Sequence, residues 1–292
     1  MQSLLKRFAP FLCLPLLAAA PVANNYEVDV AMATPTGMKL VWGDEFDGTK
    51  LDLKKWSFDT SRNKDGWYNG ERQYYAAGRP ENVRVEGGQL VIEARHEKLD
   101  PAVTPDWGGQ DYTSAKLVGR ADLTYGLYQI RAKLPCARGT WPGIWMLPKT
   151  GGWPDDGEID IMEQVGSQPN VVHATLHTAL FVHSKGTQRG GDYAVATSCD
   201  AFHTYELDWE PDSITIGVDG HGYMQVRNDQ PGGRGAWPFD DPFHLILNLA
   251  VGGNWAAAKG IDDAAMPQSM LVDWVRVYQR KGGYRPGRAK SN

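Results

Sequence analysis

Hydrophobic and polar residues alternate along several short segments of the chain, and this period of two is typical of half-buried β-strands. Turn-forming residues separate these segments, and Asp219-Gly220 is a hairpin signal. No segment shows a long helical period. The β-rich segments are 90–95, 128–133, 213–219, 243–248 and 271–278. The pattern predicts an all-β protein built as a sandwich of two antiparallel sheets.

One further predicted strand, residues 158–163, carries three carboxylates. Glu158 and Asp160 share one face of a regular strand, whereas Glu163, five residues after Glu158, would point to the other face. One extra residue in a β-bulge, at about Ile161 or Met162, would return Glu163 to the face of Glu158. The spacing therefore predicts a bulge inside this strand.

Paired carboxylates on one surface can break a glycosidic bond. Two glutamates leaning inward from a bulged strand would place their carboxyl groups about 5 to 5.5 Å apart, which is the separation in retaining glycosidases. The ordinary alternatives are a solvated acidic patch or a cation site, but Ile159, Ile161 and Met162 would pack against a core and fix the acids in place. The chain has neither an EF-hand loop nor an H-E-x-x-H motif. The pattern favours a glycoside hydrolase.

The acidic strand and the motifs around it resemble glycoside hydrolase family 16. Glu158-Ile159-Asp160-Ile161-Met162-Glu163 is similar to the E-I-D-x-x-E signature of its bacterial β-1,3-glucanases, the laminarinases. The resemblance covers about residues 38–279 and implies a jelly roll of two curved antiparallel sheets with a substrate cleft on the concave face. Other matching segments are 42–48, 69–75, 125–128, 131–135, 141–148, 174–177, 202–205, 247–255 and 273–278.

The resemblance also implies a role for each acid. Glu158 corresponds to the nucleophile, and Glu163 to the acid that protonates the leaving oxygen and then acts as the base. Asp160 would share a proton or hydrogen bond with its neighbours and keep Glu158 oriented. His177, in a motif on the neighbouring strand, would add a hydrogen bond to the cluster. We expect the pKa values of the two glutamates to be pushed apart, because like charges placed close together have that effect.

Tryptophans and polar residues near these motifs are predicted to bind the sugar. Pyranose rings stack on indole through their C–H faces, while their hydroxyls need polar partners. Lys116 stands where the family often has Arg, so bidentate sugar contacts there are not expected. The predicted substrate-binding residues are Asn69, Glu71, Trp141, Trp145, Trp153, Asn248 and Trp255. The tryptophans predicted to lie in the core are Trp42, Trp56, Trp209 and Trp274.

The resemblance further implies a structural Ca²⁺ on the convex side, away from the cleft. Glu45, Gly88 and Asp273 match the family positions that supply its oxygen ligands. Its role would be to stabilise the fold, and no cofactor is expected for catalysis.

The N-terminal residues of the chain predict export. Lys6 and Arg7 precede an apolar run that ends at Ala20, with small residues near a cleavage position. The run is too short for a membrane span, so we expect a secreted or periplasmic protein. Cys136 and Cys199 remain in the mature chain, either as a disulfide or as two thiols. The expected divisions are a signal peptide (1–23), a linker (24–37), a catalytic domain (38–280) and a flexible basic tail (281–292).

The net charge of the chain limits the class of molecule that it is expected to bind. A net charge of −5 offers no basic surface for nucleic acid, so a neutral β-glucan polysaccharide or oligosaccharide is the expected partner of a monomer. Two alternatives to an endo-acting laminarinase stay open. One is a family 16 enzyme acting on mixed-linkage β-1,3-1,4-glucan, a galactan or xyloglucan, although Met162 argues against relatives that lack the bulge. The other is a non-catalytic glucan-binding protein, although such proteins typically lose a glutamate that this chain retains.

Overall fold

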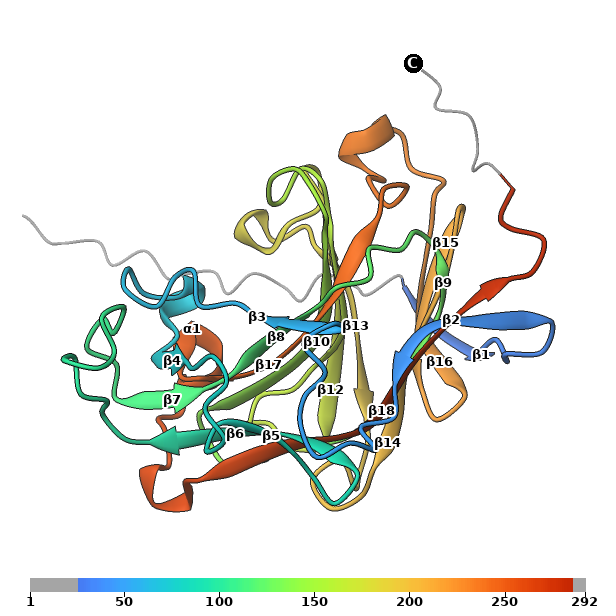
Figure 1. Cartoon of the computed structure of the whole chain (residues 1–292). Helices are drawn as coiled ribbons and strands as arrows, with labels where there is room; N and C mark the ends of the chain where they lie inside the picture. The colour runs from blue at the N-terminus through green and yellow to red at the C-terminus, as the bar shows by residue number, and fades with distance from the viewer. Residues whose placement is uncertain (1–25, 286–292) are drawn as a thin grey trace, which may run out of the picture.

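The structure of the protein is a computed structural model that describes residues 26–285. Two β-sheets pack against each other in this range, and a hydrophobic core fills the space between them (Figure 1). All strand pairs are antiparallel except β4 with β7. The larger sheet has eleven strands. In order they are β1 (Glu27–Ala31), β16 (His221–Arg227), β15 (Ser213–Val218), β14 (His203–Glu210), β9 (Gly126–Lys133), β18 (Gln268–Arg280), β6 (Gln89–His96), β7 (Tyr112–Ser114) and β4 (Gln73–Tyr75), with β2 (Met38–Asp44) on β18 and β5 (Val83–Glu86) on β6.

The smaller sheet has seven strands, and the acidic strand is the third from one edge. Its order is β13 (Arg189–Ala194), β12 (Val171–His177), β11 (Glu158–Glu163), β10 (Thr140–Pro148), β17 (Phe243–Val251), β8 (Lys116–Gly119) and β3 (Trp56–Phe58). Short helices occupy the connections: η1 (Tyr68–Gly70), η2 (His183–Lys185), η3 (Gly233–Gly235), α1 (Gly253–Ala256) and η4 (Asp263–Ala265). The predicted fold class, a β-sandwich of two sheets, is confirmed.

The core explains why the strands alternate. Side chains that point between the sheets are buried, and a regular strand contributes alternate residues to this core. Representative core residues are Ile144, Ile159 and Leu247 from the smaller sheet, and Ile130, Leu207 and Val275 from the larger. The face of the seven-stranded sheet that points away from the core is called the outer face below. No helix within residues 26–285 is long and apolar enough to cross a bilayer.

The strand β18 connects two parts of the larger sheet. On one side it pairs first with β6 and then with β2, while β9 runs along its other side. Figure 1 shows it as the long red strand that crosses much of the molecule. The register between β18 and β9 shifts between Val272 and Trp274. Val272 and Val275 are buried, whereas Trp274 is only half-buried, with the guanidinium of Arg276 lying 4.1 Å from its ring centroid.

The predicted core tryptophans are therefore confirmed in part. Trp56 and Trp209 are fully buried. Trp42 and Trp274 are half-buried, and the core prediction is wrong for both. Trp42 packs edge-on against Trp56 with ring centroids 5.2 Å apart, so it borders the core without entering it.

The fold extends further toward the ends than the expected catalytic domain. Residues Glu27–Ala31, placed in a linker by the sequence, form β1 and pair with β16. At the other end the ring of Tyr284 contacts that of Tyr125 at 5.3 Å, so the first residues of the expected tail pack against the sandwich. The predicted signal peptide and the remainder of the tail lie outside the described residues.

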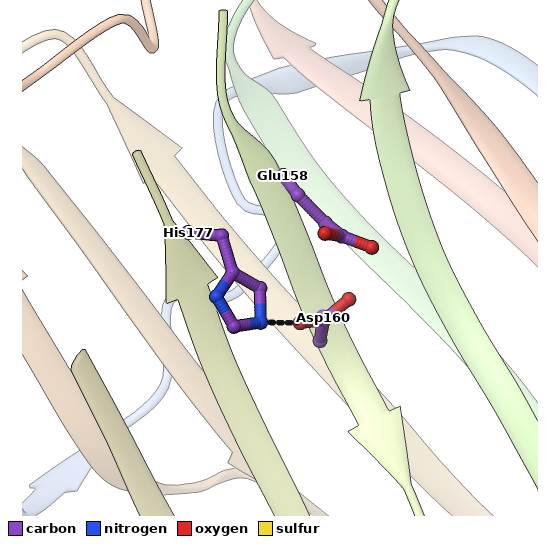
Figure 2. Close-up of side chains that lie close together, drawn as sticks. All are labelled: Glu158, Asp160 and His177. Atoms are coloured by element: carbon purple, nitrogen blue, oxygen red, sulfur yellow. Dashed lines mark ion pairs between the residues drawn. The ribbon is translucent and has the colours of Figure 1, made fainter. Parts of the chain in front are cut away.

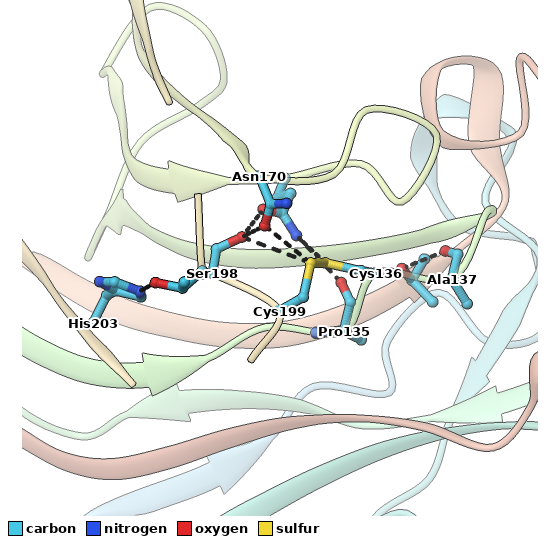
Figure 3. The surroundings of a disulfide bond; sticks show 10 residues. Pro135, Cys136, Ala137, Asn170, Ser198, Cys199 and His203 are labelled. Carbon is cyan, nitrogen blue, oxygen red and sulfur yellow. Dashed lines mark hydrogen bonds between the residues drawn. A yellow bond between two sulfur atoms is a disulfide. The ribbon is translucent and has the colours of Figure 1, made fainter. Parts of the chain in front are cut away.

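The cysteine pair is a disulfide. Cys136 and Cys199 are joined, and their Cα atoms lie 5.7 Å apart. The bond ties the connection after β9 to the connection before β14, as Figure 3 shows. The Ser198 hydroxyl beside it donates to Oε1 of Gln164 at 2.7 Å and also lies 3.1 Å from Oδ1 of Asn170. This cluster fixes the end of the sandwich that follows the acidic strand.

Candidate active site

The acidic strand β11 contains the predicted bulge. Asp160 lies opposite Thr175 of β12 and Glu163 lies opposite His173, so three steps along β11 match two along β12. The register with β10 shifts at the same place, where Met162 pairs with Ile144 and Asp160 with Trp145. The extra residue brings Glu163 back to the outer face, where Glu158 and Asp160 also lie.

Two indole N–H groups hold the two glutamates. Trp153, in the loop before β11, donates to Oε2 of Glu158. Trp141, on β10, donates to Oε1 of Glu163 at 2.9 Å. Both tryptophans were predicted to bind sugar, and the structure adds that they orient the acids. The Trp153 side chain is 48% exposed, so its ring also offers an apolar face beside Glu158.

His177 lies next to Asp160. Its Nε2 is 3.4 Å from Oδ2 of Asp160, and Glu158 is its direct partner across the strands. Figure 2 shows Glu158 and Asp160 on β11, with the dashed line joining Asp160 to the ring of His177 on β12. Burial, and then the nearby His183, lowers the pKa of His177 to about 4. The imidazole is therefore neutral at neutral pH and can exchange one hydrogen bond with Asp160.

The three carboxyl groups all have raised pKa values. Burial raises the pKa of Glu158 to about 7, against the opposing effects of the Trp153 hydrogen bond and the charge of Lys116. Burial and the charge of Glu158 raise the pKa of Glu163 to about 7. Burial and the charges of both glutamates raise the pKa of Asp160 well above its ordinary value. Burial and the two neighbouring charges thus favour the protonated form of Asp160, which can donate a hydrogen bond.

Burial raises the pKa of both glutamates to about 7, and the separation of the two pKa values by their like charges stays a prediction. The glutamates share the same buried surroundings, which raise both values together. Their difference lies in the neighbours. Trp153 and Lys116 favour the Glu158 anion, whereas the charge of Glu158 opposes ionisation of Glu163. The Trp141 hydrogen bond and the charge of His173 oppose this effect at Glu163.

The predicted residues Trp145 and Asn248 form a polar floor beside the acids. Trp145 Nε1 donates to Oδ1 of Asn248 at 2.7 Å, and Asn248 Nδ2 donates to the Tyr75 hydroxyl at 2.9 Å. Lys116 lies in the same floor with its Nζ 4.9 Å from the rings of both Trp145 and Trp67. Its Nζ pairs with Asp59 at 2.9 Å, so this lysine is a buried point charge.

The predicted substrate residues Asn69, Glu71 and Trp141 lie around Gly253, beside the acids. A Cβ on Gly253, which has a φ of 80°, would lie within 3.5 Å of Trp141, of the Asn69 carbonyl and of Glu71. Only glycine fits this close approach with a left-handed backbone. Burial raises the pKa of Glu71, which accepts a hydrogen bond from Gln73 at 2.9 Å. Asn69 is exposed on η1.

Trp255 completes this group from α1. Its ring packs edge-on against Trp141 with centroids 5.3 Å apart and against His173 at 4.8 Å. All seven predicted substrate-binding residues therefore lie on or beside the outer face that carries the acids.

The residues of the predicted calcium site lie elsewhere. The Glu45 carboxylate accepts two hydrogen bonds from Arg276, each 2.8 Å long, and Asp273 pairs with Arg131. Gly88 lies in the turn between β5 and β6. Because arginine already neutralises both carboxylates, these side chains do not form a cation cage as they stand. A cation here would depend on backbone carbonyl oxygens.

Sequence reasoning missed several residues of the site. Lys116 was noted only as a departure from the family, yet its charge favours ionisation of Glu158. Tyr75 and Trp67 border the floor from segments far away in the sequence. His173 lies directly across from Glu163. The sequence did contain a signal for His173. Side chains alternate along a strand, so His173, four residues before His177, lies on the same face as His177.

A β-sandwich with two glutamates of raised pKa on one bulged strand, surrounded by exposed and half-buried tryptophans, defines a carbohydrate-cleaving enzyme. The sequence profile described as "Glycosyl hydrolases family 16" matches residues 70–276. The protein belongs to this family and is a glycoside hydrolase.

Known relatives agree with this assignment. The chain is 50% identical over 253 residues to the "Beta-glucanase" of Rhodothermus marinus, covering 82% of this chain and 85% of that protein. SCLam, a non-specific endo-β-1,3(4)-glucanase of family 16, superposes with a TM-score of 0.84 at 53% identity, over 88% of this chain and 96% of its own. The laminarinase from Rhodothermus marinus superposes with a TM-score of 0.77 at 48% identity, over 82% and 97%.

Proposed function

We propose that this protein is an exported, endo-acting enzyme that cleaves β-1,3-glucan of the laminarin type with retention of anomeric configuration. The observation that supports this most strongly is the bulge in β11, which puts Glu158 and Glu163 on one face with a separate indole donor for each. A retaining glycosidase needs one carboxylate that attacks and one carboxyl group that transfers a proton.

In the first step Glu158 is the nucleophile. Its carboxylate attacks the anomeric carbon while Glu163 gives its proton to the departing glycosidic oxygen, and a glycosyl-enzyme ester forms. The Trp153 hydrogen bond and the charge of Lys116 support the ionised form of Glu158. The raised pKa of Asp160 favours its protonated form, which keeps a second negative charge away from the attacking group. His177 holds Asp160 from the neighbouring strand.

In the second step Glu163 is the base. Once Glu158 is esterified its negative charge is gone, so the pKa of Glu163 falls and the carboxylate left by the first transfer is stabilised. Glu163 then removes a proton from water, which attacks the anomeric carbon and releases Glu158. The Trp141 hydrogen bond favours the Glu163 anion at this stage. One pair of residues thus serves both halves of the reaction.

The substrate is proposed from the aromatic and polar residues around the acids. Exposed Trp153 can stack on a pyranose ring, and Asn248 and Glu71 can bind its hydroxyls. A mutant of SCLam holds 1,3-β-D-cellobiosyl-glucose at its active site, and its chain is 53% identical to this one over 87% of this chain and all of its own, with a TM-score of 0.84. Mixed-linkage glucan is therefore a second candidate substrate beside laminarin.

Product analysis tests this function. The purified protein is incubated with laminarin, lichenan, agarose and xyloglucan, and NMR follows the anomer that forms first. We expect oligosaccharides of mixed length from laminarin, with β-anomers appearing before mutarotation. An initial α-anomer would contradict retention. Binding of laminarin with no turnover would support the glucan-binding alternative.

We also propose export and a monomeric state. The Cys136–Cys199 disulfide supports an oxidising compartment. Expression in a bacterial host, followed by fractionation and intact-mass measurement, should find a chain shortened by about the first 23 residues outside the cytoplasm. Light scattering on the product should give the mass of one chain.

A further inference from the structure

Three residues form a row across adjacent strands of the outer face and end at Glu163. Asp192 of β13 lies directly opposite His173 of β12, and His173 lies directly opposite Glu163 of β11. Direct partners in an antiparallel pair point to the same face. Oδ1 of Asp192 is 2.6 Å from Nδ1 of His173, so this nitrogen carries a hydrogen and donates it to the carboxylate.

His173 is held from a second direction. Its ring packs edge-on against Trp255 at 4.8 Å, and Trp255 packs against Trp141, the indole that donates to Glu163. His173 is 9% exposed as a whole residue, and its Nε2 is buried with no hydrogen-bond partner among the described residues. A buried imidazole nitrogen without a partner is costly, which suggests a function beyond packing.

We propose that His173, held by Asp192, is a positioning residue that keeps Glu163 and its indole partner Trp141 in place for proton transfer to the leaving oxygen. This inference rests on the proposed role of Glu163 as the acid. His173 does not need to touch the sugar, because it acts through its strand partner and through the Trp255–Trp141 contact.

The charges around Glu163 give the inference an electrostatic consequence. Glu158 and Glu71 raise the pKa of Glu163, in addition to burial, whereas the Trp141 hydrogen bond and the charge of protonated His173 lower it. Asp192 is the charged group that faces His173 from the other side, 2.6 Å from its Nδ1. Loss of the His173 charge should therefore raise the pKa of Glu163.

The molecule offers a matched control. His203 of β14 also pairs through Nδ1 with an aspartate, Asp219, at 2.6 Å. The side-chain exposures are similar, at 14% and 52% for this pair against 11% and 58% for His173 and Asp192. The control pair lies on the larger sheet, away from the acids. A purely structural His–Asp pair should behave like this one.

The test compares His173→Gln with His203→Gln in the full chain, using two substrates that differ in leaving group. Laminarin has a poor leaving group and needs the acid, whereas a 2,4-dinitrophenyl β-laminaribioside does not. We expect His173→Gln to lose roughly 10- to 100-fold in kcat/KM on laminarin, a part of the usual contribution of a general acid, and under about 3-fold on the aryl substrate. The high-pH limb of its laminarin profile should move upward, and His203→Gln should change neither.

Equal losses on both substrates, or the same losses in His203→Gln, would overturn the inference. Asp192→Asn, at the exposed end of the row, serves as the second variant if His173→Gln does not fold, and should show a smaller but still leaving-group-dependent loss. Glu163→Gln is measured in parallel. If Glu163→Gln shows no leaving-group dependence, the assignment of the acid fails. If Glu163→Gln shows leaving-group dependence and His173→Gln does not, only the proposed role of His173 fails.

Discussion

Two groups of carboxylates in this protein have opposite surroundings. Glu158 and Glu163, on the seven-stranded sheet, lie among indoles and each other, and burial raises both pKa values to about 7. Glu97, at the end of β6 on the eleven-stranded sheet, accepts hydrogen bonds from Arg79 at 2.6 and 3.2 Å. Burial opposes ionisation there too, but Arg79 and Thr113 lower its pKa. A buried glutamate without an arginine partner thus has a raised pKa and can transfer a proton. A glutamate paired with arginine has a lowered pKa and serves the structure as a stable anion.

The largest difference should appear in activity. Glu158→Gln removes the proposed nucleophile and is expected to lower kcat on laminarin by about 10⁴-fold or more, as loss of a covalent catalytic group does. Glu97→Gln, which removes an arginine-paired carboxylate, should retain activity within about 2-fold. Initial rates on laminarin, with oligosaccharide binding by calorimetry, measure both. Full turnover by purified Glu158→Gln would remove the basis for its assignment.

A smaller effect should follow loss of one indole N–H. Trp153→Phe keeps an aromatic ring but removes the hydrogen bond that lowers the pKa of Glu158. Glu158 must be ionised to attack, so the low-pH limb of kcat/KM should shift to higher pH, with a loss of roughly 10-fold at pH 6. A pH profile on laminarin tests this. An unchanged low-pH limb would mean that the indole contributes only stacking.

The strand pattern and the acids were predictable because they depend on local spacing. The offset of Glu163 from Glu158 demanded a bulge, and the bulge is present. Trp274 was misplaced because a register shift in β18, which the alternation does not reveal, turns it outward. Lys116 and Asp59 meet through the fold, over a separation that no motif encodes.

The pKa values were not predictable for a related reason. Like charges alone would separate Glu158 from Glu163, but burial acts on both and depends on the whole sandwich. Likewise, Asp192 reaches the row of His173 and Glu163 only through the register of β12 with β13. Contacts between strands distant in sequence therefore carry the part of the site that motifs leave out.

Stability should change in opposite directions in the two groups. The folded pKa of Glu158 lies above its unfolded value of 4.5, so the folded state binds more protons between about pH 4.5 and 7 and is destabilised as pH rises. Glu158→Gln should thus be more stable than the wild type at pH 7.5, on the order of 1–2 kcal/mol, with little difference at pH 4. Glu97 has a lowered pKa and contributes stability above pH 4.5, so Glu97→Gln should be less stable at pH 7.5 by about 1 kcal/mol.

Urea unfolding at pH 4 and pH 7.5 measures these differences. We expect the gain in free energy of unfolding of Glu158→Gln over the wild type to grow with pH. For Glu97→Gln we expect a loss in free energy of unfolding. A Glu158→Gln effect that is equal at both pH values would come from packing, and the raised pKa would then have no thermodynamic consequence.

The smallest effect concerns the predicted calcium site, where arginine again decides the outcome. Arg276 and Arg131 already neutralise Glu45 and Asp273, so a bound Ca²⁺ would depend mainly on carbonyl oxygens and compete with two ion pairs. Binding should then be weak, with a Kd near the millimolar range of extracellular modules. At 10 mM CaCl₂ we expect Tm to rise by about 2–4 °C, reversed by EDTA, with laminarin hydrolysis unchanged. Asp273→Asn should reduce the rise, and an unchanged rise in this variant would mean that the Asp273 side chain is not a ligand. No rise at all would mean that the arginines satisfy these carboxylates completely.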